Sequence, residues 1–143
     1  MKQKNEEVHD KYYEGFLQLR NCEKEIYDFV YNEFDQNGIY IADQKQQKNG
    51  VDFKVSSNKF LLKLGDDLSK KYSGVKKISR KLFSQDSDTG KPIYRMTVKF
   101  EQLPFRVGDT IEHRGDEVKV QSISGDKINV KDLKTGKRFF IKK

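Results

Sequence analysis

The densest group of side chains able to bind a ligand is a cluster of cations in the middle of the sequence. Six fall within twelve residues and two more follow in a later alternating run: Lys70, Lys71, Lys76, Lys77, Arg80, Lys81, Arg95 and Lys99. Long basic side chains held on one element suit contacts with phosphate oxygens, which give affinity without reading a base sequence. We therefore predict that these residues bind nucleic acid. The alternative is that the lysines only protect an exposed strand from aggregation.

Charge is unevenly spread along the chain. The 143 residues carry a formal net charge of +7. Residues 51–100 hold 12 Lys/Arg against 5 Asp/Glu, whereas residues 1–50 hold 7 against 10. This asymmetry favours a surface that faces a polyanion over a generally basic coat. Charge that serves only solubility is the alternative explanation.

Two aromatic residues could add base stacking to the basic cluster. Tyr12 and Phe16 lie on the side of a predicted strand that faces away from the core. Aromatic rings in such positions can stack on bases. The same rings could instead pack beneath a loop, and the sequence leaves both interpretations open.

Side chains typical of catalytic centres are sparse. Neither His9 nor His113 has cysteine or carboxylate neighbours with the spacing of a triad or a metal site. Cys22 is the only cysteine and is interpreted as a core residue of the first predicted helix. Four carboxylates are interpreted as a solvated helix face and as turn formers: Asp66, Asp67, Asp86 and Asp88. We expect no enzymatic activity, cofactor or bound metal, although clustering of these carboxylates beside the cations would indicate a nucleic-acid-processing enzyme.

A long β-hairpin is predicted to position the cations. It spans residues 75–109, and residues 86–92 form its turn. The returning run alternates, with one set pointing to the core (Tyr94, Met96, Val98 and Phe100) and another to solvent (Ile93, Arg95, Thr97, Lys99 and Glu101). Pro104 then ends the strand ladder.

Four further elements are predicted before the hairpin. Residues 11–20 form a strand with Tyr13, Leu17 and Leu19 on its core side. A helix capped by Asn21 follows, with an apolar stripe of Ile26, Phe29, Val30 and Phe34, and it ends at Asn37-Gly38.

A loop is predicted over residues 43–50 and a strand over residues 51–55. Residues 56–58 cap a second helix, which Gly74 ends. The order β-α-β-α-β-β predicts an α+β sandwich, one sheet with both helices on one face.

The chain after Pro104 follows a different pattern. Short strands are predicted at residues 110–113, 118–124, 127–131 and 138–141, separated by Gly-Asp and Thr-Gly turns. This spacing predicts a small barrel. The expected organisation is a flexible tail (1–10), an α/β domain (11–103) and the barrel domain (104–143). About forty residues form a marginal core, so we expect the barrel to lean on the first domain or on a partner.

Short motifs in a fixed order resemble a known family. They are Asp52-Phe53, Ser56-Ser57, Ser79 to Leu82, Thr89-Gly90-Lys91, Tyr94-Arg95 and Phe105 to Asp109. Together they resemble the middle region of the large-ribosomal-subunit export adaptors named for nonsense-mediated mRNA decay, in the archaeal form of that family. The resemblance runs from about Tyr13 to the C-terminus.

The resemblance implies both a fold and a partner. It implies an α/β domain like a large-subunit ribosomal protein, followed by an SH3-like barrel like part of translation factor five-A. The implied partner is the large ribosomal subunit, contacted through ribosomal RNA and ribosomal proteins. The family begins with cysteine-pair zinc modules, so a chain with Cys22 alone is expected to be a fragment that lacks them.

The leading hypothesis is a non-catalytic adaptor fragment that binds the large subunit in ribosome biogenesis or quality control. The alternative is a protein-protein interaction scaffold of the translation machinery without direct RNA contact. The chain has no long apolar run and a polar N-terminus, so we expect a cytoplasmic monomer with no membrane contact. No small-molecule substrate is expected.

Overall fold

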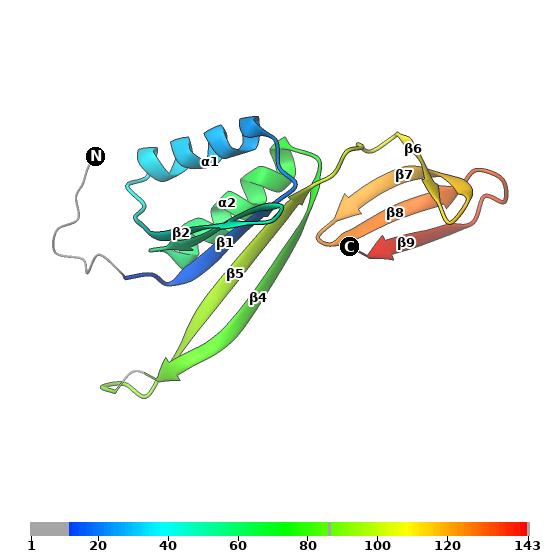
Figure 1. The fold of residues 1–143 in the computed structure, drawn as a ribbon. Coiled ribbons are helices and arrows are strands. Elements are labelled where there is room, and N and C mark those ends of the chain that lie inside the picture. Colours follow the sequence, from blue (N-terminus) through cyan, green and yellow to red (C-terminus); the bar gives the residue numbers. More distant parts are fainter. Residues whose placement is uncertain (1–11, 86, 143) are drawn as a thin grey trace.

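The fold combines two helices with two β-sheets (Figure 1). The computed structural model describes residues 12–85 and 87–142, so the predicted tail at 1–10 lies outside the described residues. The mixed α+β class predicted from the sequence is confirmed. Neither of the described helices is long and apolar enough to cross a membrane.

The first sheet has five strands in the order β2-β3-β1-β5-β4. Their bounds are β1 Gly15–Arg20, β2 Ile41–Gln47, β3 Gly50–Val55, β4 Gly74–Gln85 and β5 Pro92–Gln102. The central pair, β1 and β5, is parallel, and the other neighbours are antiparallel. Strands far apart in the sequence therefore form the middle of this sheet.

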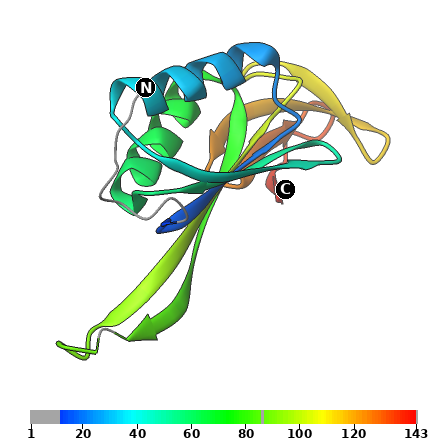
Figure 2. The same cartoon turned by 60° about the vertical axis from the view of Figure 1, so that its left-hand side comes forward.

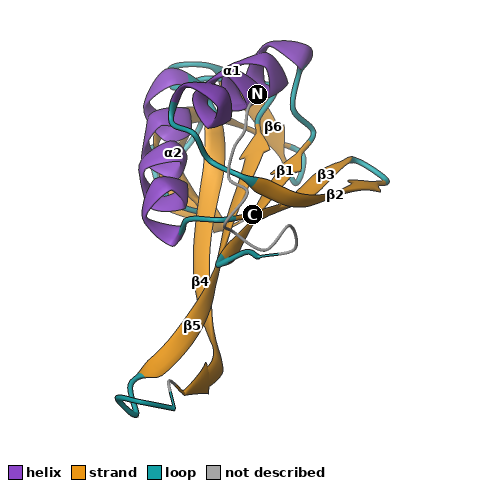
Figure 3. Ribbon diagram, turned by 90° about the vertical axis from the view of Figure 1, so that its left-hand side faces the viewer, coloured by secondary structure: helices purple, strands orange, loops and turns teal. Residues whose placement is uncertain are grey.

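Both helices pack against one face of the first sheet (Figure 3). They are α1 (Lys24–Gln36) and α2 (Asn58–Lys71). The predicted stripe on α1 is confirmed, since Ile26, Val30 and Phe34 are buried. These side chains pack against every second residue of β1, β3 and β5, for example Leu17 and Phe53. Strand alternation and helical periodicity thus bury their apolar residues in one shared core.

The predicted ends of the helices are correct at two positions. The Ser57 hydroxyl caps α2 by accepting a hydrogen bond from the Phe60 amide at 3.1 Å. Asn37 caps the C-terminus of α1, and Gly38 follows with φ +62°. The first satisfies an otherwise unpaired helical N–H, and the second places glycine where side chains are disfavoured.

Two other predicted ends are wrong. Asn21 does not cap α1, because Glu23 occupies the N-cap and the Asn21 amide donates to Glu101 Oε2 at 3.0 Å. Cys22 consequently precedes the helix instead of lying on it. Gly74 does not end α2 but opens β4, where a Cβ would lie 2.4 Å from the Phe100 ring. Close packing, and not a helix stop, explains the glycine.

The loop predicted over residues 43–50 is wrong. Most of it belongs to β2, an edge strand that pairs with β3 along its length. Its side chains are largely exposed, so the segment lacks the apolar alternation that indicates a strand. The strand is held by backbone hydrogen bonds to β3, and such bonds do not depend on whether the side chains are apolar or polar.

The predicted hairpin is confirmed as β4 and β5, and it reaches well beyond the helices (Figures 1 and 2). Its outer part, residues 79–85 and 92–95, is called the hairpin arm below. Tyr94 has the predicted orientation, with Met96 and Val98, but is 48% exposed because it lies on the arm. The arm therefore displays apolar and basic side chains to solvent.

The second sheet contains all four strands predicted after Pro104. They are β6 (Thr110–His113), β7 (Asp116–Ser124), β8 (Lys127–Asp132) and β9 (Arg138–Lys142), in that order. Within the described residues β6 and β9 do not pair, so this sheet is not a closed barrel. The rings of His113 and Phe139 nevertheless approach to 5.8 Å, so side chains of the two edge strands meet.

The second sheet shares its core with the end of the first. Its buried residues Val118, Val120, Ile128 and Val130 pack with Val75 of β4 and with Leu103. The Lys76 amide also donates a hydrogen bond to the Gly125 carbonyl at 2.9 Å. The base of the long hairpin is therefore part of both cores.

Candidate nucleic-acid interface

The face of the first sheet opposite α1 and α2 is called the open face below. Strand alternation places Phe16 of β1 and Lys99 of β5 on it, because their neighbours in sequence point into the helix-covered core. Lys77 of β4 lies on the same face because it is directly opposite Lys99. No described helix covers this face (Figure 3). It is the broad, regular surface on which side chains from three strands converge.

Four of the eight predicted nucleic-acid-binding residues gather on the open face. The register of β4 and β5 sets Lys77 directly opposite Lys99, and Lys81 directly opposite Arg95. Side chains paired in this way lie about 5 Å apart at Cβ, where like charges destabilise a sheet. The two like-charged pairs therefore do not stabilise the hairpin in the free protein.

Arg95 is held between two aromatic rings. Its guanidinium carbon lies 3.8 Å from the centroid of Tyr13 and 3.8 Å from that of Phe83. Its Nη1 is buried and has no hydrogen-bond partner within the protein. Planar stacking of this kind fixes the direction in which an arginine donates. The guanidinium group is therefore fixed in direction, and its buried Nη1 has no acceptor within the protein.

The other four predicted residues lie elsewhere. Lys76 faces the helices, with its Nζ 2.6 Å from Asp66 Oδ1 and its side chain only 18% exposed. Arg80 shares that orientation but lies on the exposed arm. Lys70 and Lys71 occupy the last turn of α2, where Lys71 Nζ lies 4.7 Å from the Phe29 ring centroid. The structure therefore divides the sequence cluster between three locations.

The ion pair of Lys76 with Asp66 gives a pH-dependent contribution to stability. The hydrogen bond and charge of Lys76 lower the pKa of Asp66 below its ordinary value. A carboxyl whose pKa is lowered by folding stabilises the protein above its unfolded pKa and loses that contribution as pH falls through the folded pKa. We expect Asp66→Asn to flatten the acid limb of stability against pH below about pH 4, measured by urea unfolding.

The effect of Asp66→Asn should be small, because the Asp66 side chain is 59% exposed and solvent screens the pair. Asp67→Asn, at the next residue of α2, provides a control with the same chemical change. If both variants changed the acid limb equally, the assigned ion pair would not be its source.

The aromatic residues predicted from the sequence lie only partly as expected. Phe16 is on the open face, where the Tyr13 ring packs edge-on against it at 5.4 Å. The Tyr12 hydroxyl donates to Glu14 Oε2 at 2.7 Å, and this bond raises the pKa of Tyr12 to about 12. Tyr13 was predicted on the core side, but it precedes β1 and its ring stacks on Arg95 instead. Alternation does not extend beyond the end of the strand.

Sequence reasoning missed two other members of the open face. Lys54 of β3 lies opposite Phe16, and its Nζ is 5.0 Å from the Tyr13 ring centroid. Phe83 lies at a shift in the β4 register, so no alternation pattern predicts its direction. For Lys54 the sequence did contain an indication, because Lys54 alternates with the apolar residues Phe53 and Val55 and must therefore point away from the core.

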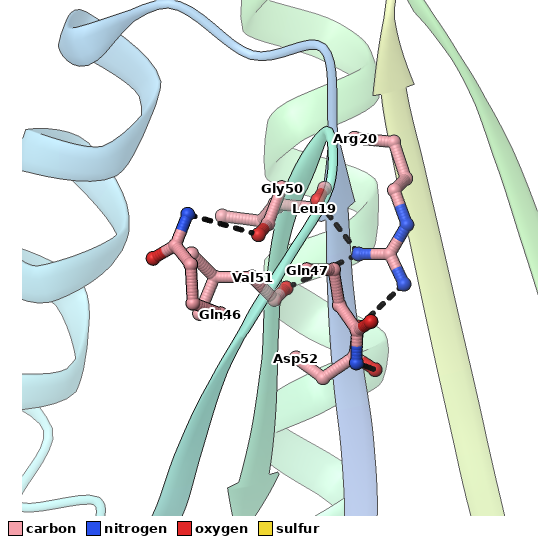
Figure 4. Close-up of polar contacts among 7 residues, drawn as sticks. All are labelled: Leu19, Arg20, Gln46, Gln47, Gly50, Val51 and Asp52. Carbon is pink, nitrogen blue, oxygen red and sulfur yellow. Dashed lines mark hydrogen bonds and ion pairs between the residues drawn. The ribbon is translucent and has the colours of Figure 1, made fainter.

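Arg20, the last residue of β1, forms an ion pair with Asp52 of β3 (Figure 4). Arg20 Nη2 lies 2.6 Å from Asp52 Oδ1, and Nη1 donates to the Leu19 carbonyl at 2.9 Å. The Gln47 amide donates to the other Asp52 oxygen at 3.0 Å. Because both of its terminal nitrogens have partners and its side chain is only 15% exposed, Arg20 holds β1 to β3 and offers little to a ligand.

The three predicted carboxylates that the structure describes are divided between α2, which holds Asp66 and Asp67, and the turn of the hairpin, which holds Asp88. Asp66 is paired with Lys76, Asp88 lies in the turn at the end of the arm, and Asp86 lies outside the described residues. Burial raises the pKa of the Cys22 thiol, which disfavours the nucleophilic thiolate. Among residues 12–85 and 87–142, no three His, Cys, Asp or Glu side chains are grouped so as to hold a metal.

Comparison with known proteins gives one family. The model of the family described as NMD3, second domain, matches residues 12–101. This range contains both helices, the first sheet except Gln102 at the end of β5, and all eight predicted nucleic-acid-binding residues. No curated protein matches the chain.

Proposed function

This chain belongs to the NMD3 family, whose members associate with the large ribosomal subunit, and we propose that it binds that subunit through ribosomal RNA. In this proposal it is a non-catalytic adaptor acting in biogenesis or quality control of the subunit. The open face lies against the RNA backbone, and the second sheet, an SH3-like module, docks beside it on RNA or ribosomal protein. We further propose a cytoplasmic monomer.

The observation that carries the proposal is the pairing of like charges on the open face. Lys77 opposite Lys99 and Lys81 opposite Arg95 create a positive strip along two strands. The residues between these pairs, Ser79 and Thr97, are polar and small. Such a strip suits a phosphate backbone, which needs charge and hydrogen-bond donors but no apolar pocket.

The hairpin arm extends this surface away from the body of the protein (Figure 2). Arg80 and Lys81 are adjacent, both exposed, and point to opposite faces of the arm. An arm that is basic on both faces can contact phosphates on two sides at once. This geometry favours insertion between RNA segments over contact with a flat protein surface.

A protein-interaction scaffold is the second candidate. It is favoured by apolar side chains on the C-terminal part, where Val107 is 57%, Leu133 51% and Phe140 54% exposed. Scattered exposed apolar residues are common, however. A contact made through these three residues would also leave the positive charges of the basic strip without an anionic partner. We therefore assign them a secondary contact at most.

Salt dependence of subunit binding distinguishes the two candidates. We expect the chain to co-sediment with purified large subunits but not with small ones. For four phosphate contacts the logarithm of the binding constant should fall against the logarithm of salt with a slope of about −3. Binding that is insensitive to salt would instead favour the protein scaffold, and equal binding to both subunits would mean that the strip attracts any polyanion.

A further inference from the structure

We propose that the hairpin arm holds an unpaired RNA nucleotide, with its base stacked on Phe83 and its phosphate bound by Arg95 and Lys81. The inference rests on the proposed RNA binding and deepens it by naming the form of RNA recognised. It assigns to the arm a readout of RNA shape that phosphate contacts alone cannot give.

A β-bulge directs Phe83 to the site. The register of β4 with β5 shifts between Leu82 and Ser84, which leaves Phe83 as the extra residue. Bulges re-aim side chains and often occur where a strand serves function. One ring face of Phe83 covers the guanidinium of Arg95 at 3.8 Å, yet the residue is 58% exposed. The ring therefore offers its remaining face to a ligand from solvent.

Unused donors surround this ring. Arg95 Nη1 is buried without a partner, and such groups in native proteins call for an acceptor. Lys81 lies directly opposite Arg95 in the strand pairing and is exposed. A phosphate beside Phe83 would lie next to the positive charges of both residues. The base attached to that phosphate would then lie within reach of the ring.

The same geometry favours an unpaired nucleotide over a double helix or a peptide. Bases within a duplex are stacked on each other and cannot cover a protein ring, whereas bases in loops and bulges can. An acidic peptide would need apolar pockets for its side chains. The residues between the two cation pairs, Ser79 and Thr97, are small and polar and form no such pocket. Phe16 supplies a second aromatic ring on the same open face.

Tryptophan fluorescence can test stacking at this position directly, because the chain contains no tryptophan. In a Phe83→Trp variant all indole emission comes from the proposed site. We expect a short single-stranded RNA to quench this emission strongly, and a duplex of the same sequence to quench it little. Leu82→Trp is the matched control: Leu82 is 56% exposed on the same arm but points to the opposite face, away from Arg95 and Lys81, so its emission should be quenched far less than that of F83W.

Affinity measurements separate this inference from the proposed function. Phe83→Ala should weaken single-stranded RNA binding about tenfold, or about 1.4 kcal/mol, while duplex binding changes less than twofold and Phe83→Tyr restores affinity. Circular dichroism checks that each variant is folded. Unquenched F83W emission at saturating RNA would overturn the stacking site. If Lys77→Gln still weakened binding to both RNAs, RNA binding through the strip would stand without the stacking site; if neither variant had an effect, both proposals would fail.

Discussion

Reversing the charges of Lys77 and Lys81 together should weaken binding to the large ribosomal subunit by about a hundredfold or more at moderate salt. Both side chains are exposed on the open face, and each lies opposite another cation. A hydrogen bond to a charged group contributes about 1.5–3 kcal/mol, and glutamate adds repulsion from phosphate. The slope of affinity against salt should fall by about 1 for each phosphate that the variant no longer binds.

A neighbouring pair of lysines provides the control for this prediction. Lys76→Gln and Lys77→Gln remove the same charge from adjacent residues of β4, but only Lys77 lies on the open face. We expect Lys77→Gln to weaken subunit binding and reduce its salt slope, measured by co-sedimentation. Lys76→Gln should leave the slope unchanged, since its charge is already paired with Asp66. Equal effects of the two variants would show that only net charge matters.

The sequence predicts the first sheet well wherever one face of a strand is buried. Alternation in residues 93–101 separates Met96 and Val98 in the core from Lys99 on the open face, as the structure has them. The same rule fails for β2, because an exposed edge strand needs no apolar side chains. Alternation also does not reveal that the arm of the hairpin is exposed on both faces. Burial along β4 and β5 ends where α2 ends, and the pattern within the strands carries no information about the length of that helix.

The arginine stack illustrates why the candidate site was only partly predictable. Arg95 was predicted to face solvent, and strand parity alone gives that result. Its two aromatic partners escape the pattern, since Tyr13 precedes β1 and Phe83 belongs to a bulge. Bulges and strand ends depend on backbone register, which residue types specify weakly. The chemistry of the cluster was therefore visible in the sequence, but its orientation and aromatic supports were not.

The largest effect on folding is expected at the junction of the two cores. Leu103 is 4% exposed and, with Val75, packs into the core of the second sheet. Truncating a buried leucine to alanine costs about 2–5 kcal/mol. A unit of about forty residues has a total stability of only about 2–6 kcal/mol on typical per-residue values. Leu103→Ala should therefore unfold the second sheet while the first sheet stays folded.

Hydrogen exchange on the intact chain can test this selectivity residue by residue. In Leu103→Ala we expect the amides of Val120 and Val130 to lose protection, and those of Leu17 and Val98 to keep it. Val107→Ala is the matched control, because Val107 is 57% exposed near the same junction and should change stability by less than about 0.5 kcal/mol. By the same reasoning a peptide of residues 104–143 should be unfolded, since it lacks two of the six buried residues of its core. A folded peptide would mean that the second sheet is stable without the hairpin base, and the shared core would then serve only to orient the two sheets.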